Sequence, residues 1–133
     1  MPHAPILASL TAAFVALSAC AGTGPVSQGS LNPSYQGIQT VLLQEDMVSF
    51  RVALQGARDN ADVEAYGRCA AAQYALIRGF GFARHIRTTV AQTGNTWRGD
   101  AVYLISAALP PGLRTIDAEV TVRDCGALGI PTI

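Results

Sequence analysis

Residues 47–54 read Met-Val-Ser-Phe-Arg-Val-Ala-Leu, and large apolar side chains stand at every second position from Val48 to Leu54. Successive side chains of an extended chain point to opposite faces, so these apolar residues share one face while Ser49 and Arg51 lie on the other. The stretch therefore predicts a β-strand with one face on a core and the other toward water or a partner.

A helix is expected after this strand, over residues 60–78. Asp59 or Asn60 can act as its N-cap, and Gly79 is a typical residue at a helix C-terminus. Acidic residues fall in the first turn and an arginine in the last, as the helix dipole favours. Small residues beside the apolar stripe would let the helix lie close to a sheet, with Cys69 on or near the buried face.

The remaining segments predict strands over residues 38–43, 80–92, 97–109 and 115–123, where apolar residues recur in extended patterns bounded by turn residues. Short turns between consecutive strands favour antiparallel pairing. The expected fold is α+β with two layers. One helix packs on a mainly antiparallel sheet of four to five strands, in the order (β)β-α-β-β-β.

The chain begins with an apolar run over residues 6–17 that ends in Leu17-Ser18-Ala19-Cys20. This pattern resembles the lipobox of bacterial lipoproteins, where cleavage falls between Ala19 and Cys20 and the new N-terminal cysteine is acylated. The first five residues lack the Lys or Arg that such signals usually carry. A plain secretory signal, an uncleaved anchor and a chance cysteine are the alternatives. The run is too short to span a bilayer, which needs about 20 residues.

This interpretation divides the chain into a signal peptide (residues 1–19), a lipidated Cys20 with a flexible tether (20–36) and a small α+β domain (37–133). Gly, Ser, Pro and Asn dominate the tether. Acyl chains on Cys20 would hold the protein in the lipid bilayer without spanning it. In Gram-negative lipoproteins, an Asp directly after the lipidated cysteine favours retention in the inner membrane. This chain has Ala21 at that position, so the outer membrane is favoured.

Two cysteines remain after Cys20, and an even pair in an oxidising compartment predicts a disulfide between Cys69 and Cys125. Two separate buried thiols are the alternative, because free cysteine often lies in protein cores.

The helix and the segment after it resemble a family of small uncharacterised envelope lipoproteins of Gram-negative bacteria. In that family a strand precedes a helix with an Ala-Ala-Glu core, and a glycine and two aromatic residues follow. Gln73 replaces the glutamate in this chain. The resemblance implies a location and a fold more than a function. The matching residues are Tyr66, Ala71, Ala72, Gln73, Gly79, Phe80 and Phe82.

The sequence argues against several classes of chemistry. A formal net charge of zero gives no reason to expect nucleic-acid binding. No CxxC, HExxH or carboxylate cluster predicts a metal or cofactor site. His85 is the one histidine beyond the signal, and nothing in its spacing to Ser49 or Ser106 indicates a nucleophile beside a base. We therefore expect no catalytic residues.

The segment Arg84-His85-Ile86-Arg87 is the one local concentration of positive charge. It predicts a weak site for an anionic envelope ligand, such as a lipid head group or a peptidoglycan carboxylate, because arginine binds both groups well. Strand alternation places Arg84 on one face and both His85 and Arg87 on the other. The alternative is a solvated strand face paired with acidic residues of the neighbouring strand.

These observations predict a non-catalytic binding or assembly module, held at a membrane, with an envelope protein or peptidoglycan as partner. An envelope redox or stress sensor that uses the pair Cys69 and Cys125 is one alternative. A small secreted hydrolase, or an inhibitor of one, is another. A cavity in which His85 touches a hydroxyl or carboxylate would favour the enzyme.

Overall fold

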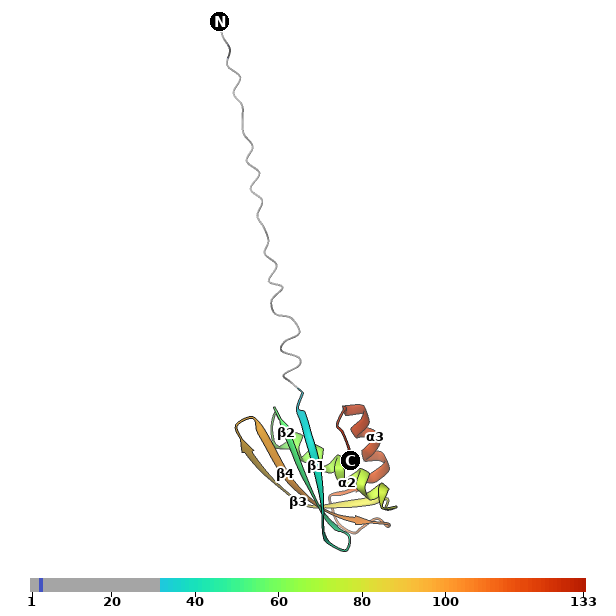
Figure 1. Cartoon of the computed structure of the whole chain (residues 1–133). Helices are drawn as coiled ribbons and strands as arrows, with labels where there is room; N and C mark the ends of the chain where they lie inside the picture. The colour runs from blue at the N-terminus through green and yellow to red at the C-terminus, as the bar shows by residue number, and fades with distance from the viewer. Residues whose placement is uncertain (1–2, 4–31) are drawn as a thin grey trace.

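The computed structural model describes residue 3 and residues 32–133, which form an antiparallel sheet with two helices on one face (Figure 1). The predicted signal peptide, the cleavage site before Cys20 and most of the tether lie outside the described residues. The elements are β1 (Ser34–Gln44), β2 (Met47–Gln55), α2 (Asn60–Ile77), β3 (Phe82–Thr93), β4 (Thr96–Ser106), β5 (Thr115–Asp117) and α3 (Ala118–Leu128).

The five strands lie in the order β1-β2-β4-β3-β5, and every neighbouring pair is antiparallel. The predicted α+β class is therefore confirmed. β1 is longer than expected, because it begins at Ser34 within the predicted tether and runs to Gln44. The hairpin of β3 and β4 forms close to the predicted positions.

The alternating residues of β2 form the centre of the core, as the sequence predicts. Val48, Phe50 and Leu54 are fully buried beneath α2. Helix α2 begins at an N-cap, Asp59, whose carboxylate accepts a hydrogen bond from the Ala61 N–H at 2.9 Å. This bond satisfies one of the backbone donors left free at a helix N-terminus.

Helix α2 lies unusually close to the sheet because a glycine stands at the contact on each side. One glycine is on α2 and faces β4, and the other is on β4 and faces α2. A Cβ built on Gly67 of α2 would stand 2.6 Å from the Cβ of Ala101 on β4. A Cβ on Gly99 of β4 would overlap the side chain of Val63 on α2. The absence of side chains at these two positions therefore sets the distance between the two layers.

The strand predicted over residues 115–123 is wrong beyond Asp117, where helix α3 begins. The Asp117 carboxylate accepts a hydrogen bond from the Val120 N–H at 3.1 Å and so caps the helix. Ala118 and Cys125 are buried and Val122 packs on the core, a spacing of four and three residues that suits a helix face. The same segment also alternates, which is why its sequence resembles a strand.

The Cys69–Cys125 disulfide predicted from the sequence is present and joins α2 to α3, with the two Cα atoms 6.0 Å apart. Both cysteines are buried, at 1% and 3% exposure. The bond therefore attaches the C-terminal helix to the helix that covers the sheet.

Candidate functional site

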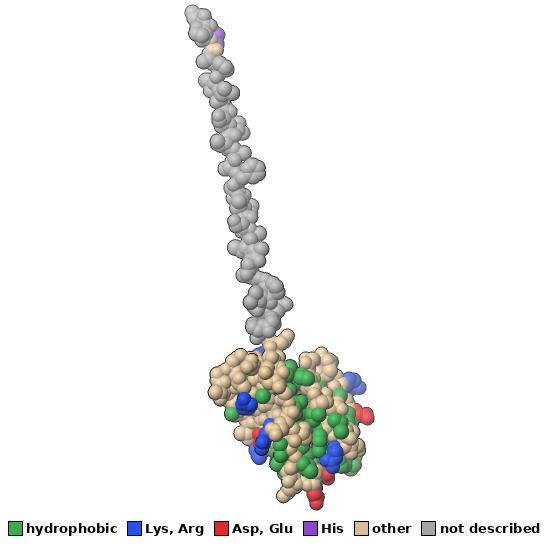
Figure 2. Space-filling model, viewed as in Figure 1, with side chains coloured by type: hydrophobic (Ala, Val, Ile, Leu, Met, Phe, Trp, Pro, Cys, Tyr) green, Lys and Arg blue, Asp and Glu red, His purple; other side chains and the backbone are tan. Residues whose placement is uncertain are grey.

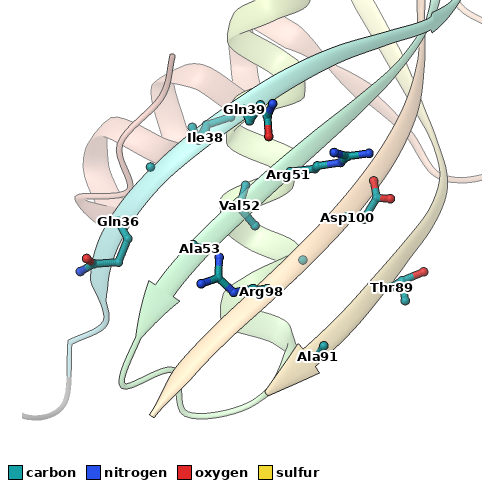
Figure 3. Close-up of a pocket in the computed structure, with 12 residues that line it drawn as sticks. Gln36, Ile38, Gln39, Arg51, Val52, Ala53, Thr89, Ala91, Arg98 and Asp100 are labelled. Carbon is teal, nitrogen blue, oxygen red and sulfur yellow. The ribbon is translucent and has the colours of Figure 1, made fainter. Parts of the chain in front are cut away.

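The face of the sheet opposite α2, called the outer face here, carries a groove of about 590 Å³ (Figure 3). Two rows of side chains cross it from strand to strand. The first row is Gln39, Arg51, Asp100 and Thr89, and each member lies directly opposite the next in the β-ladders. The row places one cation beside one anion, between two neutral hydrogen-bonding side chains.

The second row places an arginine among small residues. Ala53 of β2 and Ala91 of β3 both lie opposite Arg98 of β4, and Gly37 lies beyond Ala53. Small neighbours leave the guanidinium of Arg98 uncovered above the sheet, and Arg98 is exposed. Figure 3 shows Arg51 and Arg98 extending over the same face, with α2 behind the sheet.

Beside the first row, Ser49 of β2 is a buried polar residue at 1% exposure. Its hydroxyl donates a hydrogen bond to the Asp100 carboxylate. Asp100 is thereby held in place by a neutral donor, and no ion pair within 4.0 Å joins it to Arg51 among the described residues. Arg51 is exposed, so its guanidinium is available to a ligand.

The predicted anion-binding residues Arg84, His85 and Arg87 do not share the faces expected from alternation. A bulge between His85 and Arg87 leaves Ile86 without a partner in the β3–β4 ladder. One extra residue reverses the side on which the following side chains point. Arg84 and Arg87 therefore lie on the outer face, opposite Leu104 and Val102, and His85 lies on the helix side.

Within residues 32–133, the outer face thus carries Arg51, Arg84, Arg87 and Arg98, with the carboxylate of Asp100 among them. Arg84 is less available than the others, because its Nη1 lies 3.5 Å from the Pro111 carbonyl and its Nε is buried without a described partner. Arg87 donates to the Thr89 hydroxyl at 3.2 Å. The sequence did not single out Arg51 and Arg98, which meet only through the β2–β4 pairing.

On the helix side, His85 borders a second cavity of about 200 Å³, together with Glu64, Arg68, Tyr103 and Arg114. The imidazole Nε2 lies 2.7 Å from the Thr88 hydroxyl. Burial lowers the pKa of His85 below its ordinary value, and the nearby Arg114 guanidinium lowers it further. Burial also raises the pKa of the Tyr103 hydroxyl to about 12.

The contact between His85 and Thr88 is the hydroxyl contact that would favour an enzyme, but the two candidate serines lie elsewhere. Ser49 faces the outer side and donates to Asp100, whereas Ser106 donates to the Ala108 carbonyl at 2.6 Å. His85 is on the opposite face of the sheet, beside the Tyr103 ring. The structure therefore does not bring His85 together with either serine.

Within residues 32–133, His, Cys, Asp and Glu form no group of three that could hold a metal ion. No helix in this described part is long and apolar enough to cross a membrane. Figure 2 shows basic and acidic side chains scattered over one face of the molecule, with apolar surface between them.

Residues 35–129 match the family model of the YNQ4 C-terminal domain, a range that contains every described strand and helix except Ser34 at the start of β1. This chain belongs to that family. A YNQ4 C-terminal domain thus contains both the outer-face groove and the helix-side cavity.

A relative of this YNQ4 C-terminal domain is an uncharacterised 26.9 kDa protein in the nqo8 5′ region of Paracoccus denitrificans. The two are 31% identical over 113 residues, an alignment that covers 80% of this chain and 44% of the relative. The chain therefore spans less than half of the relative's length. No solved structure matches. The family and this relative are uncharacterised, as the resemblance seen in the sequence implies, and neither description mentions a lipid anchor.

Proposed function

We propose that this chain is a lipid-anchored protein of the bacterial cell envelope whose YNQ4 C-terminal domain is a non-catalytic binding module. The residues Leu17 to Cys20 support the anchor, because they combine a short apolar run with a cysteine at the expected cleavage site. The Cys69–Cys125 disulfide supports an oxidising compartment, where such bonds persist. Ala21, the residue after Cys20, favours the outer membrane over the inner one.

The outer-face groove is the single observation that carries the binding proposal. It is a hollow of about 590 Å³, within the range of ordinary ligand sites, and small residues such as Ala53 and Ala91 lie between a few polar groups at fixed positions. Arg51 and Arg98 supply donors suited to carboxylate or phosphate, and Asp100 supplies an acceptor. Two uncovered arginines to one acid in the lining of the groove favour an anionic ligand.

Two envelope materials present such anions: the peptide carboxylates of peptidoglycan and the phosphates of lipid head groups. The polar row from Gln39 to Thr89 runs across four strands, so the groove suits an elongated ligand with hydrogen-bonding groups along its length. A peptide has such groups, and a lone head group does not. We therefore favour the peptide carboxylates of peptidoglycan.

The alternative functions have less support from the geometry. A redox sensor needs a strained or accessible disulfide, whereas Cys69 and Cys125 are both buried. A serine hydrolase needs a nucleophile beside its base, and His85 lies on the opposite face from Ser49 and Ser106.

Co-sedimentation with purified peptidoglycan tests the groove. The double variant Arg51→Gln/Arg98→Gln should bind at least about tenfold more weakly than the wild type, because each charge-assisted hydrogen bond contributes about 1.5–3 kcal/mol. Arg123→Gln is the control, since it removes one arginine charge, half of that lost in the double variant, from an exposed position on α3 and should change the affinity less than about twofold.

Vesicles containing anionic phospholipid separate the two sources of the ligand. Groove-dependent binding to vesicles, with none to peptidoglycan, would assign the groove to lipid head groups. Equal binding by the double variant and the wild type to both materials would refute the groove as the ligand site.

A further inference from the structure

The helix-side cavity holds charges that do not pair with one another. Glu64 and Arg68 lie one turn apart on α2, where opposite charges ordinarily attract, and Arg114 faces them from the segment before β5. The ion pair found within residues 32–133 is between Arg58 and Asp62, away from this cavity. Glu64, Arg68 and Arg114 therefore border one hollow with their charges available.

The base of the cavity adds polar groups from the sheet. Tyr103 is 4% exposed, and its ring lies against that of His85 with the ring centres 5.0 Å apart. Thr115 is also in the lining, but it lies opposite Arg84 in the β3–β5 ladder, which places its side chain on the outer side of the sheet.

Arg114 has an unusual backbone conformation. Its φ of 68° lies in the left-handed region, which residues with side chains rarely adopt, and its carbonyl accepts a hydrogen bond from the His85 N–H at 3.0 Å. Such conformations persist where the surrounding structure requires them, and they concentrate at ligand sites. This backbone attaches Arg114 to the strand that carries His85.

From these residues we propose that the helix-side cavity binds a small α-amino acid, with its carboxylate between Arg68 and Arg114 and its ammonium group toward Glu64. The volume of about 200 Å³ is below the roughly 300–1,000 Å³ of sites for drug-sized ligands, so we place a ligand of few heavy atoms in it. Glu64, His85 and Arg114 also border an adjoining hollow of about 520 Å³, into which the amino acid's own side chain can extend. Two arginines suit a carboxylate, and one glutamate suits a single cation. The site lies on the opposite face from the outer-face groove and does not depend on the groove's function.

His85 provides a direct reporter for this site. It is the one histidine from residue 20 onward, so its imidazole gives a single set of proton NMR signals in that chain. Alanine titrated into the disulfide-bonded chain of residues 20–133 with Cys20→Ser should shift these signals with saturation, at a Kd of about 1 mM or lower. A carboxylate bound beside His85 should also raise the pKa of the imidazole, which burial and Arg114 now lower.

Two fragments of alanine separate the contributions of its charges. Propionate lacks the ammonium group and ethylamine lacks the carboxylate, so each should bind at least about tenfold more weakly than alanine. Arg68→Gln should weaken alanine and propionate alike, whereas Glu64→Gln should weaken alanine alone. Arg123→Gln, remote from the cavity, should leave all three affinities unchanged.

Three results would overturn the assignment. They are an unchanged His85 spectrum at 20-fold the expected Kd, equal affinity for alanine and propionate, and a shift that persists in both Arg68→Gln and Glu64→Gln. Loss of alanine binding in Arg51→Gln/Arg98→Gln, with binding intact in Arg68→Gln, would also overturn it, because the amino acid would then occupy the groove. The peptidoglycan assay is separate, so either site can fail alone.

Discussion

Removal of the Cys69–Cys125 disulfide should lower the free energy of unfolding by about 4 kcal/mol. The bond joins residues 56 positions apart, and cross-links that close long loops restrict the unfolded chain strongly. The variant Cys69→Ala/Cys125→Ala keeps the site apolar, so the loss measured by urea denaturation reflects the cross-link and a small packing defect. A domain of this size has about 5–15 kcal/mol of stability, so the variant should fold but unfold at much lower urea.

Chemical reduction of the wild type is the matched control, and its unfolding midpoint should approach that of the double alanine variant. Hydrogen exchange should locate the effect. Amides of α3 should lose protection first, because α3 is covalently attached to α2 through this bond. An unchanged urea midpoint after complete reduction would contradict the stabilising role assigned to the disulfide.

A second large effect is expected at the contact between helix and sheet. Gly67→Ala should destabilise the domain by about 2 kcal/mol, although alanine ordinarily stabilises a helix relative to glycine by about 1 kcal/mol. The new methyl group would stand 2.6 Å from the Ala101 Cβ, and neither atom can rotate away. Helix α2 would have to move off β4, at the cost of contacts throughout the core. Thermal or urea unfolding measures the change directly.

Gly126→Ala should change the stability of the same domain in the opposite direction, and it serves as the control. Gly126 lies within α3, and a Cβ built there would meet no heavy atom within 4 Å outside its immediate surroundings. This substitution should stabilise the domain by about 1 kcal/mol through helix propensity alone. If Gly67→Ala and Gly126→Ala raised the free energy of unfolding by similar amounts, α2 would have room for a methyl group at Gly67 and could not lie this close to β4.

The parts of the fold that follow from local sequence could be predicted. The alternation over residues 47–54 gave β2, and the capping residues with the apolar stripe gave α2 to within one residue. The C-terminal segment could not be assigned this way, because Ala118 and Val122 fit both a strand face and a helix face. Two features decide for the helix there: the Asp117 cap and the disulfide that holds Cys125 against α2.

The candidate sites were harder to predict, because they depend on which strands become neighbours. Arg51 and Arg98 are 47 positions apart and meet only because β2 pairs with β4. The bulge at Ile86 moves Arg87 to the outer face, and alternation alone cannot reveal an unpaired residue in a ladder. The cysteine pair was easier, since two cysteines permit one pairing.

The most direct test of the central proposal is the mass and membrane partition of the mature protein. The full chain and its Cys20→Ser variant are expressed in a Gram-negative host, and each product is measured by intact mass spectrometry and by fractionation. We expect the wild type to begin at Cys20, to carry acyl mass on that residue and to pellet with the outer membrane, and the variant to be soluble or retained uncleaved. A wild type without acyl mass would contradict the proposed anchor and leave Cys20 a free thiol.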